Sequence, residues 1–153
     1  GNPDDYDFEI RSQKELSEML TSTSDMMTIL LACVAGISLL VGGIGIMNIM
    51  YVSVTERIKE IGLRMSVGAR EKDILMQFLI ESILISITGG LIGVIFGFFS
   101  SYGVKFFAGW PVFIEPWSVA LSFVVCSAIG IFFGWYPARK AAGLDPIEAL
   151  RYE

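Results

Sequence analysis

The sequence of 153 residues contains no histidine and only two cysteines, and only 18% of it is charged. Histidine is the side chain most often used as a general base and as a metal ligand, so its absence argues against both kinds of chemistry. The cysteines, Cys33 and Cys126, lie inside apolar runs, which favours packing over a disulfide or a metal pair. We therefore predict no catalytic, cofactor-binding or metal site in this chain.

Charged residues are missing altogether from three apolar stretches, residues 26–54, 82–104 and 117–136. A bilayer core about 30 Å thick needs about 20 helical residues, so each stretch is long enough to span it. Pro137 follows the third stretch and is expected to stop its helix. Ion-coupled pumps usually keep ionisable residues inside their spans, so the sequence argues against that class. It predicts an all-α membrane protein with three transmembrane helices.

Lysine and arginine gather on one side of these predicted spans. Five of them lie in residues 55–81 and three in residues 137–153, whereas residues 105–116 contain only Lys105. Loops rich in lysine and arginine stay in the cytoplasm. The 55–81 loop and the 137–153 tail are therefore predicted to be cytoplasmic, which leaves residues 1–25 and the 105–116 loop outside.

Residues 1–25 are polar, and most of their charged side chains are acidic, which argues against nucleic acid as a partner. Within them, YDFEI (6–10) alternates as a half-buried strand would, and residues 12–25 are compatible with a helical stalk. No signal peptide precedes this segment, so an upstream segment must carry it across the membrane. We interpret the chain as the C-terminal part of a longer protein, with residues 1–25 as the end of an extracytoplasmic domain and its stalk.

The 55–81 loop holds a dense patch of charge. Val54, Ile58, Ile61 and Met65 recur at helical spacing and line one face, and SVGAR (66–70) is typical of an exit turn. Such a helix can rest on lipid headgroups, but an anionic membrane surface favours a mostly basic face. A balance of acids and bases fits a protein partner better. The charged face comprises Glu56, Lys59, Glu60 and Arg64.

Glycines recur at intervals of four in the second and third predicted spans. This spacing lets two helices approach backbone to backbone, because close packing drives helix association in lipid. The partner can be a neighbouring helix of this chain or a second copy, and the spacing does not distinguish them. The predicted packing glycines are Gly89, Gly93, Gly97, Gly130 and Gly134.

Asn48 is the most polar residue deep in the first predicted span. It can contact a substrate, or it can hydrogen-bond a neighbouring helix, which is the commoner use of such a residue in lipid. We therefore add Asn48 to the predicted packing residues.

The tail predicts a further short helix. Asp145 can cap it, Pro146 suits its first turn, and Glu148 stands three residues after the cap. The alternative is a dangling terminus.

Three segments together resemble a known family. GGIGIMNIMYVSVTERIKEIGLRMSVGAR (42–70), ILMQFLIES (74–82) and FGWYPARKAAGLDPIEAL (133–150) are similar to the MacB group of ABC transporter permeases, within the FtsX-like superfamily. The resemblance covers the chain from about residue 8 onward, FEIRSQKEL (8–16) included.

The resemblance implies an architecture and a set of coupling residues. Permeases of this family have four spans with a large extracytoplasmic domain after the first, so this chain would hold spans two to four. Residues 55–69 match the family's coupling helix, which docks on the ATPase domain. The long first span matches a stalk helix that relays ATPase dimerisation outward, called mechanotransmission, in which no substrate crosses the bilayer itself. The implied coupling residues are Glu56, Arg57, Glu60, Ile61 and Arg64.

The resemblance also implies a function for the complete protein, an ATPase-coupled translocase of the bacterial inner membrane. ATP and Mg²⁺ would be bound by an ATPase domain, fused upstream or on a separate subunit. The exporter would work as a homodimer on macrolides and other antibiotics, peptides or toxins, with a periplasmic adaptor and an outer-membrane channel. Two alternatives stay open: a related permease that releases lipoproteins or regulates a cell-wall hydrolase, and a scaffold or sensor subunit that binds no ATPase.

Overall fold

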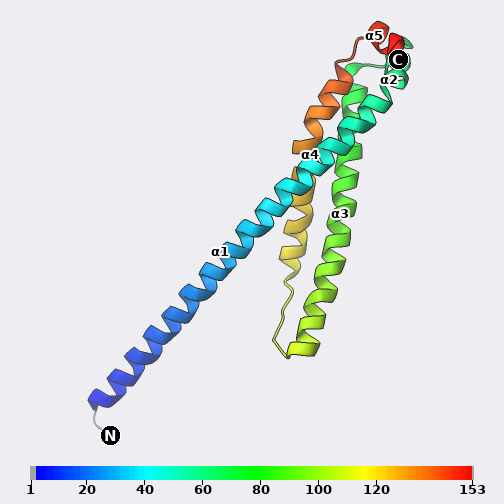
Figure 1. The fold of residues 1–153 in the computed structure, drawn as a ribbon. Helices are drawn as coiled ribbons and strands as arrows, with labels where there is room; N and C mark the ends of the chain where they lie inside the picture. Colours follow the sequence, from blue (N-terminus) through cyan, green and yellow to red (C-terminus); the bar gives the residue numbers. More distant parts are fainter. Residues whose placement is uncertain (1–2, 153) are drawn as a thin grey trace. The chain divides into compact units, whose positions relative to one another are not determined.

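All the regular structure in the described part of the chain is helical. The computed structural model describes the backbone of residues 3–152 and the side chains of residues 6–152, so the start of the predicted 1–25 segment lies outside it. The helices are α1 (Pro3–Glu56), α2 (Ile58–Ser66), α3 (Glu71–Ala108), α4 (Pro116–Ala142) and α5 (Pro146–Arg151) (Figure 1). The predicted all-α fold is confirmed for these residues.

Three helices, α1, α3 and α4, are long and apolar enough to cross a membrane. A helix satisfies its own backbone hydrogen bonds, which is what a segment in hydrocarbon requires. Between 6% and 11% of the residues in their most apolar stretches are buried against the rest of the chain. Most of this apolar surface is therefore not covered by the rest of the described chain, and the predicted three-span membrane protein is confirmed within the described residues.

α1 runs without interruption through the predicted stalk and the first predicted span. Among the described residues, 3–40 form one unit, a single length of this helix, and 41–152 form a second. The strand predicted at residues 6–10 is corrected, because these residues are helical. A strand needs a neighbouring strand to pair its backbone groups, and the described residues contain none, so the groups pair locally.

α3 and α4 pack along each other, and their limits differ from the prediction (Figure 1). α3 begins at Glu71, well before residue 82, and the Asp73 carboxylate accepts a hydrogen bond from the Arg70 backbone N–H at 3.1 Å. α4 continues through Pro137 to Ala142, so the prediction that Pro137 stops the helix is wrong. Pro137 removes one helical hydrogen bond, but burial of this end of the helix offsets the loss.

The tail forms the predicted short helix. α5 begins at Pro146, and the Asp145 carboxylate accepts from the Ile147 backbone N–H at 2.9 Å. This bond satisfies one of the N–H groups that every helix start leaves without an intrahelical partner.

Candidate functional site

A small apolar core holds together the ends of the helices around α2. Ile61 from α2 is 2% exposed and Phe78 from α3 is 1% exposed, and both belong to a cluster that includes residues of α1 and α4. Burial of these side chains stabilises the contact of α2 with the other helices, by about 25 cal/mol for each Å² of apolar surface removed from water. The buried members of the cluster are Met50, Val54, Ile61, Ile74, Phe78, Ala138, Ala141 and Ala142.

α2 is amphipathic, as its residue spacing predicts. Ile58 is half-buried and Met65 packs against the apolar core, whereas Lys59 and Glu60 are exposed. Ile61, a predicted coupling residue, lies inside the core and cannot contact a partner while that core is intact. Sequence reasoning also missed two exposed apolar side chains, Leu63 (57% exposed) and Val67 (83% exposed).

The turn after α2 is the predicted exit turn. α2 ends at Ser66, and Gly68 has a φ of 113°, a conformation that residues with a Cβ rarely adopt. The Ala69 N–H donates to the Arg64 carbonyl at 3.0 Å and closes the turn. At the other end, one residue outside the helical pattern, Arg57, separates α2 from α1.

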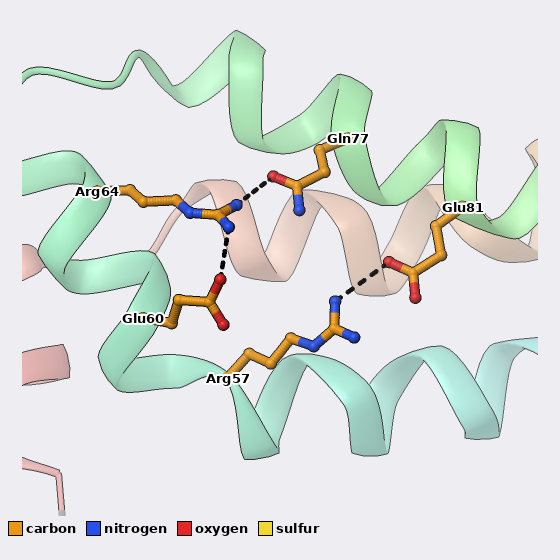
Figure 2. Close-up of polar contacts among 5 residues, drawn as sticks. All are labelled: Arg57, Glu60, Arg64, Gln77 and Glu81. Atoms are coloured by element: carbon orange, nitrogen blue, oxygen red, sulfur yellow. Dashed lines mark hydrogen bonds and ion pairs between the residues drawn. The ribbon is translucent and has the colours of Figure 1, made fainter.

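Two of the predicted coupling arginines reach towards α3 (Figure 2). Arg64 donates through Nη1 to Gln77 Oε1 at 2.6 Å and through Nη2 to Glu60 Oε1 at 2.5 Å. Arg57 Nη1 lies 3.6 Å from Glu81 Oε2. The guanidinium groups therefore connect α2, and the residue just before it, to α3, while Glu56 is exposed. Sequence reasoning did not find Gln77 or Glu81.

α5 packs directly on α2. Gly62 is buried, and a Cβ placed on it would lie 2.6 Å from the Ala149 Cβ. Ala149 is itself buried, so the two helices meet with almost no side chain between them. The tail helix is thus part of the support for α2.

A further polar contact joins α4 to α1. Lys140 Nζ donates to the Tyr51 hydroxyl at 2.5 Å and lies 4.1 Å from the centre of its ring.

Six residues form the small-residue seam between α3 and α4. Ser82 donates to the Gly130 carbonyl at 2.9 Å and Ser86 to the Cys126 carbonyl at 2.5 Å. A Cβ on Gly134 would collide with the Ser82 side chain. The seam comprises Ser82, Ser86 and Gly90 on α3, and Cys126, Gly130 and Gly134 on α4.

The other predicted packing residues lie away from the seam. A Cβ added to Gly89, Gly93 or Gly97 would meet nothing within 4 Å. Asn48 is exposed. Among the predicted packing glycines, only Gly130 and Gly134 closely approach another helix within the part of the chain that the structure describes.

Comparison with known proteins gives a consistent picture. Residues 32–146 match the family described as FtsX-like permease C-terminal. The chain is 54% identical over 146 residues to the macrolide export ATP-binding/permease protein MacB of Bdellovibrio bacteriovorus, covering 95% of this chain and 22% of the relative. It is 58% identical over 149 residues to MacB of Chlorobium phaeobacteroides, covering 97% and 23%.

A relative with a different name matches equally far along the chain. The uncharacterized ABC transporter permease YknZ of Bacillus subtilis is 49% identical over 154 residues, covering all of this chain and 38% of that protein. The chain thus spans about a quarter or less of the MacB relatives and under half of YknZ.

Proposed function

This chain belongs to the FtsX-like permease family, and from that premise we propose that it is the membrane part of an ATP-driven ABC exporter in which α2 docks an ATPase domain. The observation that carries the proposal is the arrangement of α2. Its apolar face is buried in the core, yet Leu63 and Val67 are exposed beside charged side chains of both signs. Such a mixed surface suits a protein partner better than an anionic lipid surface.

The proposed mechanism is mechanical. ATP and Mg²⁺ bind to the ATPase domain, fused upstream or on a separate subunit, and closure of two such domains moves α2. α1 continues from α2 with one intervening residue and would carry this movement across the membrane to the extracytoplasmic side. Charge-free apolar stretches support a scheme in which no substrate crosses the bilayer through these helices.

The proposal includes a location and partners. The α2–α5 end and the C-terminus face the cytoplasm of a bacterium, with the protein in its inner membrane as a homodimer. The relatives named for macrolide export support macrolides as substrates, and the proposal extends to other antibiotics, peptides or toxins taken from the periplasm. A periplasmic adaptor and an outer-membrane channel would complete the route in a cell with two membranes.

The docking assignment can be tested by photo-crosslinking in the complete protein. A benzophenone amino acid is placed at Lys59 or Leu63, and crosslinked peptides are identified by mass spectrometry. We expect peptides from the nucleotide-binding domain at both positions, whether that domain is fused or separate. Phe113, which is 88% exposed in the loop between α3 and α4, is the matched control and should give none. If Lys59 and Leu63 also give none, the docking proposal is wrong.

The substrate class needs a separate measurement. Cells that lack the native gene are complemented with the complete protein, and their macrolide susceptibility is compared with that of cells carrying Leu63→Glu. We expect protection that the substitution abolishes, because a buried carboxylate at the docking surface is costly. Phe113→Glu should leave protection intact. If the unmodified protein gives no protection, macrolides are not its substrate.

A further inference from the structure

Two polar contacts fasten α2 to α3 in addition to the apolar core. Arg64 contacts Gln77, and Arg57 contacts Glu81 (Figure 2). Gln77 and Glu81 are four residues apart, so they lie one helical turn apart on the same face of α3. Arg57 stands just before α2, and Arg64 lies seven residues later near the end of that helix. The earlier arginine meets the later partner on α3, so the two segments run in opposite directions.

The chemistry of the pairs favours orientation over stability. Both arginines and both of their partners on α3 keep some contact with solvent, and exposed ion pairs of this kind contribute little to folding. An arginine fork, however, fixes direction, because its donors are rigid and planar. Arg64 uses this property fully: one arm holds Glu60 on α2 and the other holds Gln77 on α3.

We propose that Gln77 and Glu81 are positioning residues that hold α2 at a fixed angle to α3, so that α2 and the α3–α4 pair move as one body when the ATPase acts. The proposal rests on the proposed function for the source of the movement. Without the two contacts, α2 keeps its core but can rotate about it. Movement of the ATPase would then be absorbed at α2.

The test measures the angle of α2 directly in the complete protein with its ATPase. Spin labels are placed at Lys59→Cys and Leu84→Cys, with Cys33 and Cys126 replaced by alanine. Their distance distribution is recorded by pulsed electron paramagnetic resonance, without nucleotide and with Mg-ATP and vanadate. In the parent protein we expect one narrow distribution that is the same in both states.

Removing both acceptors should broaden that distribution. Gln77→Met with Glu81→Met keeps side-chain size but leaves Arg57 and Arg64 without partners on α3. We expect a broader distribution with an unchanged melting temperature, a combination that loss of stability alone would not produce. Two other proteins should keep the narrow distribution: Gln77→Glu with Glu81 intact, which retains an acceptor for Arg64, and the exchange Arg57→Glu with Glu81→Arg.

The matched control is Glu71→Met on the same helix. Glu71 makes no ion pair among the described residues, so its loss should leave the distribution narrow. A parent-like distribution in the Gln77→Met/Glu81→Met protein would overturn the inference, as would a parent distribution that shifts with nucleotide. Crosslinking from Lys59 separates the two proposals. If no ATPase peptides are crosslinked, the proposed docking on α2 is wrong. If they are, the spin-label result tests the positioning role of Gln77 and Glu81 alone.

Discussion

Two faces of α3 carry small residues at the same spacing, and only one of them is packed. Ser82, Ser86 and Gly90 follow each other at intervals of four and lie in the small-residue seam. Gly89, Gly93 and Gly97 follow the same rule, with open space around them. Small side chains at helical spacing thus mark a surface that can approach another helix. They do not say whether this chain supplies that helix.

The seam differs from the open face in its hydrogen bonds. Serine hydroxyls on α3 donate to carbonyl groups of α4, which glycine cannot do. The facing residues on α4, Cys126, Gly130 and Gly134, repeat the interval of four. The packed face therefore consists of two facing rows of small residues. The row on α3 contributes hydroxyl donors, and the glycines on α4 let the two helices approach closely.

The largest expected effect comes from filling the seam. Gly134→Leu would drive a side chain into Ser82 and force α3 and α4 apart, at a cost of about 1–3 kcal/mol or more. Unfolding of the complete protein in detergent measures this change. Gly93→Leu is the matched control on the open face and should change stability by less than about 0.5 kcal/mol. An equal loss of stability in both variants would show that the open face is also covered in the complete protein. The proposed difference between the two faces would then be wrong.

A smaller effect is expected when the seam loses its donors. Ser82→Ala with Ser86→Ala removes two interhelical hydrogen bonds, each worth about 0.6 kcal/mol in a membrane. The same unfolding measurement should show a loss of about 1 kcal/mol. Ser122→Ala provides the comparison, since its hydroxyl bonds to the Ser118 carbonyl within α4 and should cost less. If each of the three serines costs the same unfolding free energy when it is replaced, the interhelical hydrogen bonds do not stabilise the seam.

The smallest expected effect tests one step of the seam, between Gly90 and Cys126. A Cβ at Gly90 would lie 2.8 Å from the Cys126 Sγ, a side chain that can turn away. Gly90→Ala should therefore destabilise by less than about 1 kcal/mol. Cys126→Ala in the same protein should recover the loss, which a double-mutant cycle would detect. Gly89→Ala, one residue away on the open side, should show no coupling to Cys126; coupling there would contradict the assignment of the two faces.

The buried face of α2 could be predicted from the sequence, because it depends on one helix alone. Val54, Ile58, Ile61 and Met65 share a face by helical periodicity, and that face enters the core. The complete burial of Ile61 could not be predicted, because it depends on a core to which several helices contribute. Contacts from Arg57 and Arg64 to α3 likewise depend on how two helices lie in register.

The seam could have been found in part. Ser82, Ser86 and Gly90 form a row of small residues that the sequence displays as openly as the glycine row beside it. Spacing by itself gave no reason to prefer one row over the other. The end of α4 was mispredicted for a related reason: Pro137 weakens a helix locally, and only the burial around it keeps the helix going.

The residue that separates α1 from α2 leaves no backbone group unpaired. The Arg57 N–H is shared between the Ser53 and Val54 carbonyls, both at 3.2 Å, and the Arg57 carbonyl accepts from the Ile61 N–H at 2.9 Å. The chain therefore turns from α1 into α2 while both backbone groups of Arg57 keep a hydrogen-bonding partner. A joint without an unsatisfied backbone group can lie at the end of a membrane span and still pass a movement from one helix to the next.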